Sequence, residues 1–392
     1  MSSELLGDEA VWQVLDVGSI WMKEFAAALG AMVPTVAWEP AMERFGAFQS
    51  WEREEVLQHP VLTVRRFPLQ RGYATRVVGA VLPFERRLVP PLLRAAGGEA
   101  RRSVLVCSTP FYAPVAERWA GPVVYYSTDL THAYEGLDAA QVKALDRRLC
   151  RVAAVVAPNS RRIADYFVAE SGCDPAKITV VPNATRASNV MAEAPPAGAG
   201  ELPPDLRELK RPIAGVLGDL SGNMDWLLTR RVMELTAERM PELRWAFVGP
   251  TTRAIADAEQ NAARVWAMER ATFVGAKPYG ELQAYARSFD VAVLPYKRKE
   301  PTFSGSSTRF YEHLAACRPM VATRGFAELM EKPPLLRLVD TAEEMAAEIA
   351  ALGALGYADG QERTRWEASR VGTWEERART VVRAVQAAEN RV

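Results

Sequence analysis

Short runs of apolar residues alternate with longer segments of helical periodicity along nearly the whole chain. Apolar runs of a few residues bounded by turn residues predict buried strands. The segments between them repeat their apolar residues every three or four positions, which predicts helices. This regular alternation indicates an α/β protein built on parallel sheets.

In the first half, the pattern predicts strands over 12–17, 35–40, 62–67, 103–110, 122–129, 151–158 and 177–183. Helices are predicted over 19–29, 76–95 and 138–148. A further helix is expected to begin after Asn159, a favourable N-cap residue, and to stop before Gly172.

The composition changes between Thr185 and Pro212, where proline, alanine and glycine dominate and no strand pattern remains. Strands are predicted again over 212–218, 243–250, 271–276, 290–296, 319–323 and 335–340, and helices over 224–239, 279–287, 308–316 and 341–351. The pattern therefore predicts four parts, which are an N-terminal domain at 1–185, a linker at 186–211, a C-terminal domain at 212–372 and a final helix at 373–392.

The two α/β halves predict two Rossmann-like, doubly wound sheets, in which ligands bind at the carboxyl ends of the strands. Several ligand motifs are absent from the sequence. There is no GxGxxG after a strand for a dinucleotide, no GxxxxGK[ST] for a P-loop and no GxSxG for an α/β-hydrolase. No bound cofactor is therefore expected.

Composition narrows the class further. Lysine plus arginine equals aspartate plus glutamate, at 48 each, so the net charge does not indicate a nucleic-acid partner. Three histidines and four scattered cysteines show no metal-ligand spacing, and no metal site is expected. The acidic N-terminus resembles no export signal, and no apolar run approaches the ~20 residues of a spanning helix. The sequence predicts a cytoplasmic protein.

The segment 290–323 carries the most chemical information. A buried strand ends in a basic loop, and the small residues Ser304, Gly305, Ser306, Ser307 and Thr308 then lead into a helix. Backbone amides and the helix dipole at such a start favour a phosphate, and Arg309 adds a planar cation. Glu312, one turn into the helix, could accept hydrogen bonds from a ribose diol. The competing interpretation is an ordinary capped helix without a ligand.

The order of motifs resembles that of GT-B glycosyltransferases, closest to the GT4-like enzymes of bacterial cell-surface polysaccharide and glycolipid synthesis. The resemblance rests on DVAVLPY, a small-residue loop and then RFYEHLAACRPMVAT. VAAVVAPNS, KITVVPNAT, GVLGDLSGNMDWLL and LRWAFVGP match in the same order. It implies two Rossmann-like domains with an interdomain cleft, and a final helix that crosses back onto the first domain.

The resemblance also implies a UDP-, GDP- or TDP-sugar donor and the residues that bind it. Glu312 would bind the ribose, and Arg309 with the Ser304–Thr308 loop would bind the pyrophosphate. Gly218 and Asp219 would form the floor of the donor site, and Val274 and Lys277 would lie near the base. In one respect the chain departs from the pattern. Retaining GT4 enzymes carry a glutamate eight residues before the ribose-binding one, and this chain has Ser304 there.

An inverting transfer needs a general base that takes the proton of the acceptor hydroxyl. Asp129 is the first candidate because it follows a predicted strand, and His132 lies in the same loop. Gly18 and Ser19, at the start of a helix after the first strand, are further cleft candidates. The competing interpretation is that Asp129 caps a turn and His132 is surface.

Residues 61–102 hold nine arginines against Glu85 and Glu99, mixed with apolar residues. Such a segment suits an anionic membrane surface or a lipid-linked acceptor, although solvated arginines on a packed helix would give the same pattern. The predicted function is metal-independent transfer from a nucleotide sugar to a lipid-linked or saccharide acceptor. The alternatives are a natural-product glycosyltransferase, a sugar-nucleotide epimerase and a non-catalytic partner protein with the same fold.

Overall fold

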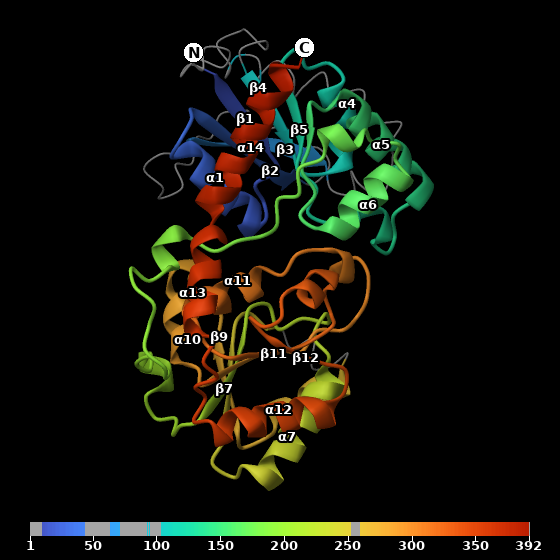
Figure 1. The fold of residues 1–392 in the computed structure, drawn as a ribbon. Helices are drawn as coiled ribbons and strands as arrows, with labels where there is room; N and C mark the ends of the chain where they lie inside the picture. Colours follow the sequence, from blue (N-terminus) through green and yellow to red (C-terminus); the bar gives the residue numbers. More distant parts are fainter. Residues whose placement is uncertain are drawn as a thin grey trace. The chain divides into compact units, whose positions relative to one another are not determined.

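The computed structural model describes residues 10–43, 63–70, 92, 94, 103–251 and 259–391. The chain divides into two compact units. The first comprises Met1–Asn183 with Trp374–Val392, and the second comprises Ala184–Thr373. Figure 1 shows each unit as a sheet with flanking helices.

The first unit is built on a six-stranded parallel sheet in the order β3-β2-β1-β4-β5-β6. Its strands are β1 (Val11–Leu15), β2 (Thr35–Glu43), β3 (Thr63–Gln70), β4 (Ser103–Cys107), β5 (Val123–Tyr125) and β6 (Val155–Val156). Its helices are α1 (Ile20–Gly30), α4 (Ala113–Ala116), α5 (Ala139–Val152), α6 (Arg161–Ala169) and α14 (Trp374–Glu389). The predicted final helix is confirmed as α14, which runs alongside α1 (Figure 1).

The second unit repeats this topology, with a six-stranded parallel sheet in the order β12-β11-β10-β7-β8-β9. Its strands are β7 (Ile213–Leu217), β8 (Arg244–Val248), β9 (Ala271–Gly275), β10 (Val291–Leu294), β11 (Met320–Thr323) and β12 (Arg337–Val339). Its helices are α7 (Trp226–Arg239), α9 (Gln260–Trp266), α10 (Leu282–Ser288), α11 (Thr308–Ala316), α12 (Ala342–Ala354) and α13 (Glu362–Val371). In chain order, each sheet has the doubly wound Rossmann order 3-2-1-4-5-6. The predicted fold class is confirmed.

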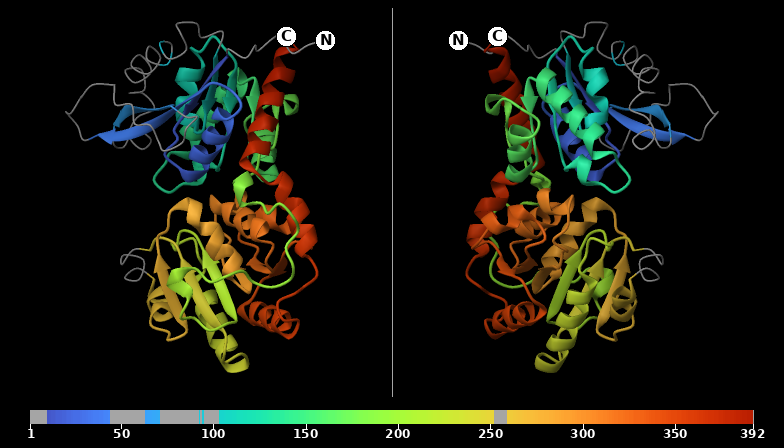
Figure 2. Two further views of the ribbon diagram at one scale, coloured as in Figure 1. Left: turned by 90° about the vertical axis from the view of Figure 1, so that its left-hand side faces the viewer. Right: turned by 90° about the vertical axis from the view of Figure 1, so that its right-hand side faces the viewer.

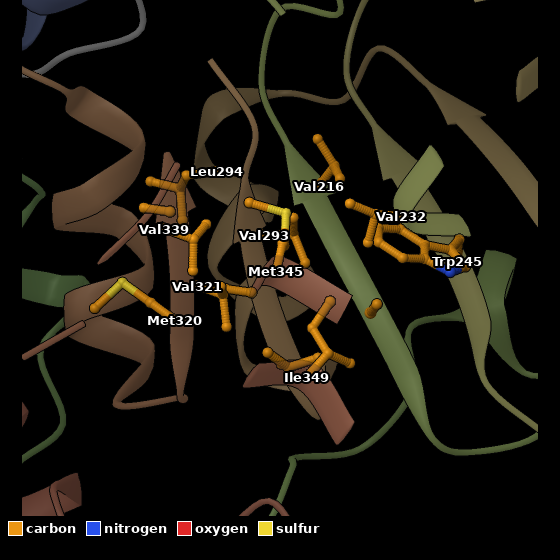
Figure 3. Packing of buried hydrophobic residues seen from close by; sticks show 14 of the residues in the cluster. Val216, Val232, Trp245, Val293, Leu294, Met320, Val321, Val339, Met345 and Ile349 are labelled. Atoms are coloured by element: carbon orange, nitrogen blue, oxygen red, sulfur yellow. The ribbon is translucent and has the colours of Figure 1, made fainter. Parts of the chain in front are cut away.

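Alternation along the strands of the second sheet divides its core between two faces. Val216 on β7 packs in the cluster that contains Met345 and Ile349 of α12. Its neighbour Leu217 packs in the other cluster, with Ala286 of α10. Figure 3 shows the α12 side chains lying against the sheet, and Figure 2 shows the helices on both faces. This packing holds the carboxyl ends of the strands in place.

Two of the expected local features of the first unit differ from the structure. Residues 177–183 form no strand and make only a single bridge between Ile178 and Val156. Thr179 and Val181 do donate to Val156 and Pro158, but Pro182 has no N–H to extend the ladder. The N-cap of α6 is Ser160, not Asn159, because the Asn159 amide donates to the Thr128 carbonyl instead.

Most of the arginine-rich segment 61–102, including the predicted helix over 76–95, lies outside the described residues. The segment 186–211, predicted as a linker, lies in the second unit and is tied to it by hydrogen bonds. The Gly200 amide donates to the Arg287 carbonyl, and Trp366 Nε1 donates to the Met191 carbonyl. In the described part of the chain, no helix has the length and apolar character needed to cross a bilayer.

Candidate functional site

The reversal of strand order in the second sheet lies between β7 and β10, which are neighbours. In doubly wound sheets, ligands bind beside the loops that follow the two strands at this reversal, at the carboxyl edge of the sheet. The β7 strand ends at Leu217 and is followed by Gly218 and Asp219. The loop after β10 leads to the small-residue segment and α11. Most of the predicted donor residues therefore belong to these two loops.

Three glycines at the ends of β7, β8 and β9 let the backbone turn and approach closely. Gly218, Gly249 and Gly275 have φ angles of +109°, +150° and +81°, a region that side chains rarely tolerate. A Cβ on Gly249 would lie 1.7 Å from the Gly218 carbonyl oxygen. The absence of side chains here keeps the edge of the sheet open beside α11.

Arg309, in the first turn of α11, lies directly on this glycine edge. A Cβ on Gly218 would fall 1.8 Å from the Arg309 Nε, and Arg309 Nη2 donates to the Asp219 carbonyl at 3.2 Å. The guanidinium also stacks over the Tyr296 ring, with 5.1 Å to the centroid. Its Nε is buried and has no hydrogen-bond partner among the described residues. The structure thus brings Gly218, Asp219 and Arg309 together around a cation with an unmet donor, which suits phosphate oxygens.

The start of α11 is held firmly. Ser307 is the N-cap, and its hydroxyl accepts from the Phe310 amide at 3.3 Å. The buried Glu328 carboxylate accepts from the Ser307 amide at 3.1 Å and from the Tyr311 hydroxyl. Lys332 lies 3.2 Å from Glu328. Ser306 is buried and Thr308 half-buried at the same turn.

Ser304 and Gly305 precede this turn. Ser304 is fully buried, and its amide and hydroxyl donate to the carboxylate of Glu300 at 3.1 Å and 2.7 Å. Gly305 follows in an extended conformation, with φ −76° and ψ −170°. A carboxylate therefore sits against the position at which the chain departs from the retaining GT4 pattern.

Glu312 is only 2% exposed and is surrounded by donors of its own unit. Its Oε2 accepts from the Thr185 hydroxyl at 3.0 Å and from the Asn189 amide at 3.2 Å. Its Oε1 accepts from the Tyr279 hydroxyl. A carboxylate has about four acceptor positions, so these bonds occupy most of them. Glu312 thus also joins α11 to the segment that opens the second unit.

Val274 and Lys277, the residues predicted to lie near the base, contact the segment around Leu206 and Asp205. Val274 is half-buried and packs against the cluster that contains Leu206. The Lys277 ammonium lies 2.8 Å from the Asp205 carboxylate, which also accepts from the Tyr285 hydroxyl. Pairing with Asp205 raises the pKa of Lys277.

In the first unit, Asp129 follows β5 at the carboxyl edge. Its Oδ2 accepts from the Thr128 hydroxyl at 3.3 Å. Burial raises its pKa to about 6, and hydrogen bonds from Tyr134 and Thr128 only partly oppose that rise. The His132 ring stacks on Tyr166 of α6, with 4.6 Å between the centroids. The two candidates share a loop but have different partners, and the raised pKa of Asp129 suits a general base.

Gly18 and Ser19 lie in the loop after β1. Gly18 is exposed, and Ser19 is the N-cap of α1, with its hydroxyl accepting from the Met22 amide at 3.4 Å. Asp16, just before them, has a left-handed backbone with φ 62°. Burial raises the pKa of the Asp16 carboxyl. Asp16 is therefore a second carboxyl with a raised pKa at the carboxyl edge of the first sheet, where Asp129 also lies.

Several residues of the site were not predicted from the sequence. They are Thr185, Asn189, Tyr279, Tyr296, Glu300 and Glu328. Of these six, Tyr296 and Glu300 lie within the segment 290–323. Within the described ranges, no group of three or more His, Cys, Asp or Glu side chains is arranged to hold a metal ion.

The chain is similar to known glycosyltransferases in part of its sequence and in its fold. Residues 22–184 match the family described as a glycosyl transferase 4-like domain. A search of curated protein sequences finds no match. The fold resembles HepE from Anabaena, solved with UDP and glucose, with 16% identity, coverage of 97% of this chain and 98% of that one, and a TM-score of 0.64.

Two further structures have the same fold. Sucrose-phosphate synthase from Thermosynechococcus elongatus has 15% identity and a TM-score of 0.72, with 98% of this chain and 100% of that one covered. A UDP-forming trehalose-phosphate synthase from Burkholderia xenovorans, in complex with glucose-6-phosphate, has 14% identity, coverage of 96% and 100%, and a TM-score of 0.69. Residues 22–184 thus match a glycosyl transferase 4-like domain, and the whole chain has the fold of these enzymes, as the resemblance to GT-B glycosyltransferases predicted.

Proposed function

We propose that the protein transfers a sugar from a UDP-sugar to an acceptor hydroxyl, with the diphosphate held by Arg309 and the start of α11. The observation that carries this proposal is the Arg309 guanidinium packed on Gly218, with a buried Nε that lacks a partner. A departing UDP gains negative charge as the glycosidic bond breaks. A fixed guanidinium and a helix N-terminus stabilise that charge without reorganisation. UDP is favoured as the nucleotide because HepE was solved with it.

Glu312, one turn into α11, is proposed to bind the ribose through its carboxylate. Gly218 and Asp219 would form the floor beneath the diphosphate. The Ser306–Thr308 turn would offer its amides to the phosphates. Val274 and Lys277 are proposed to lie near the base, although their contacts with the Leu206 cluster and Asp205 give that role less support.

Asp129 is the proposed general base. With a pKa of about 6 its carboxyl is largely ionised at neutral pH, yet it is basic enough to accept the acceptor proton. His132 has less support because its ring lies against Tyr166. With a serine at position 304, an inverting outcome is favoured, since direct displacement needs one base and no second donor-side glutamate.

The finer parts of the function are also proposals. The acceptor would be a saccharide or a lipid-linked sugar, and transfer would need no metal. The arginine-rich segment 61–102 would bring the enzyme to an anionic inner membrane surface from the cytoplasm. Gly18 and Ser19 would contribute to the acceptor side.

The experiment is a transfer assay that measures UDP release from UDP-glucose, UDP-galactose and UDP-N-acetylglucosamine, with and without saccharide and lipid-linked acceptors. Acceptor-dependent release that is lost in Asp129→Asn supports the proposal. Conversion of the donor without any acceptor would instead indicate an epimerase. Binding of UDP with no turnover of any donor would favour a non-catalytic protein.

A further inference from the structure

The loop between β10 and α11 holds a carboxylate in a fixed orientation. Glu300 Oε1 accepts from the Ser304 hydroxyl at 2.7 Å, and Oε2 accepts from the Ser304 amide at 3.1 Å. Ser304 is fully buried, while Glu300 is only half-buried. Two bonds to one anchored residue therefore fix a carboxylate that is still in reach of solvent.

This carboxylate stands at the beginning of the same loop whose end carries the proposed diphosphate site. Ser304 closes a short 3-10 turn over Thr302–Ser304, and Ser307 caps α11 three residues later. The neighbouring cations have other contacts. Lys297 pairs with Glu259 at 2.8 Å, and Arg298 lies over the Phe303 ring at 4.7 Å.

We propose that Glu300 is a specificity-determining residue whose carboxylate receives hydroxyl groups of the donor sugar. This inference rests on the proposed function. In a nucleotide sugar the sugar is joined to the outer phosphate, so a diphosphate at Arg309 and Ser307 places the sugar beside the preceding loop. Hydroxyl-to-carboxylate hydrogen bonds are charge-assisted and strong. A carboxylate already held by Ser304 loses little freedom when it binds a sugar.

The position of the carboxylate strengthens the inference. Ser304 is where the chain lacks the glutamate of the retaining pattern, and Glu300 brings a carboxylate to that residue from four positions earlier. A purely local role, in which Glu300 only closes the loop, is the alternative. Glutamine removes the charge and keeps one of the two oxygens that accept from Ser304, so it weakens the contact with the loop without abolishing it.

The test compares the affinities for UDP and for UDP-glucose, UDP-galactose and UDP-N-acetylglucosamine, measured by calorimetry on the whole chain. In Glu300→Gln, the Kd for UDP should stay within about twofold, while that for the preferred UDP-sugar should rise about tenfold or more. Ser304→Ala, which frees one side of the carboxylate, should give a smaller rise. Glu348→Gln is the control for loss of charge. It removes the α12 carboxylate that pairs with Arg337 of β12, and it should change neither Kd.

The outcomes separate this inference from the donor site itself. If UDP binds and Glu300→Gln keeps the wild-type ratio of UDP-sugar to UDP affinity for all three sugars, the inference is wrong and the donor site stands. If the wild type binds neither UDP nor any UDP-sugar, the proposed function fails and this inference fails with it. The melting temperature of unliganded Glu300→Gln should fall only by the equivalent of one lost hydrogen bond, as in Ser304→Ala, and a much larger drop would assign Glu300 to the loop alone.

Discussion

The Glu312 carboxylate accepts a hydrogen bond from the Thr185 hydroxyl at 3.0 Å, although 127 positions separate the two residues. Thr185 also accepts from the Asn189 amide, which donates to Glu312 as well. The residue proposed to bind the ribose is thus part of a buried polar cluster that fixes the start of the second unit to α11. Structural and ligand roles must be separated at this position.

Glu312→Ala should lower both stability and UDP binding. It leaves the Thr185, Asn189 and Tyr279 donors without their acceptor, at a cost of about 1–3 kcal/mol for each buried group left unpaired. Thr185→Val removes the two bonds that the Thr185 hydroxyl makes in the cluster but keeps the carboxylate. Melting temperatures with and without UDP should show destabilisation in both variants but loss of the UDP-induced shift only in Glu312→Ala. Equal UDP shifts in the two variants would make Glu312 a structural residue only.

Gly218→Ala should abolish nucleotide binding. The added Cβ meets the Arg309 Nε at 1.8 Å, and the φ of +109° strains any side chain, at a cost of about 1–3 kcal/mol. Gly222→Ala is a matched control in the same loop, because a Cβ there meets nothing within 4 Å. UDP titration of both variants provides the measurement. Wild-type affinity in a folded Gly218→Ala protein would remove Gly218 and Arg309 from the donor site.

The proposed base gives a pH prediction. Asp129 must be ionised to accept a proton, and its pKa is raised to about 6, so kcat/KM should fall about tenfold per unit as pH drops below that value. Asp129→Asn should bind UDP normally and lose transfer at every pH. A pH profile of the wild type and a UDP titration of the variant check these points. Retained turnover in Asp129→Asn would reject the assignment.

A second buried carboxyl affects stability rather than turnover. Asp146 accepts from the Tyr125 and Tyr166 hydroxyls, and burial raises its pKa to about 6. Since the folded pKa lies above the unfolded value of about 3.9, its contribution to stability is complete below pH 4 and is lost as pH rises through 6.

Asp146→Asn should therefore lack this loss. Relative to the wild type, the variant should gain on the order of 2 kcal/mol in unfolding free energy between pH 4 and pH 7. Urea unfolding of both proteins at the two pH values measures the difference. Asp165→Asn, at an exposed position of α6, is the control and should show no such gain. A pH-independent difference between Asp146→Asn and the wild type would contradict the burial argument.

The strands and helices that bury an apolar side were well predicted from the sequence. The helix predicted over 308–316 is present as α11 with the same bounds. The α13 helix was missed, because its buried residues include Arg365, whose guanidinium donates to Asp359 and to the Leu335 carbonyl. Because arginine is usually exposed, a buried arginine is counted as a surface position in a hydrophobic pattern, and the helix is not predicted.

The candidate site was predictable only where its residues are neighbours in sequence. Ser304 to Arg309 lie in one loop and helix, and the resemblance pointed to Gly218. Thr185 and Tyr279 reach Glu312 only through the folded chain, and nothing in their local sequence distinguishes them from surface polar residues. Glu300 sits in a basic loop, where its bonds to Ser304 depend on a turn that the sequence does not reveal.

The central claim is that the second unit binds a nucleoside diphosphate at Arg309. Calorimetric titration of UDP, GDP, dTDP and CDP into the wild type and Arg309→Ala tests it most directly. We expect saturable binding of UDP by the wild type, and a loss of about tenfold or more in Arg309→Ala, as for a charge-assisted contact. Absence of binding for all four nucleotides, or equal affinity in both proteins, would contradict the account.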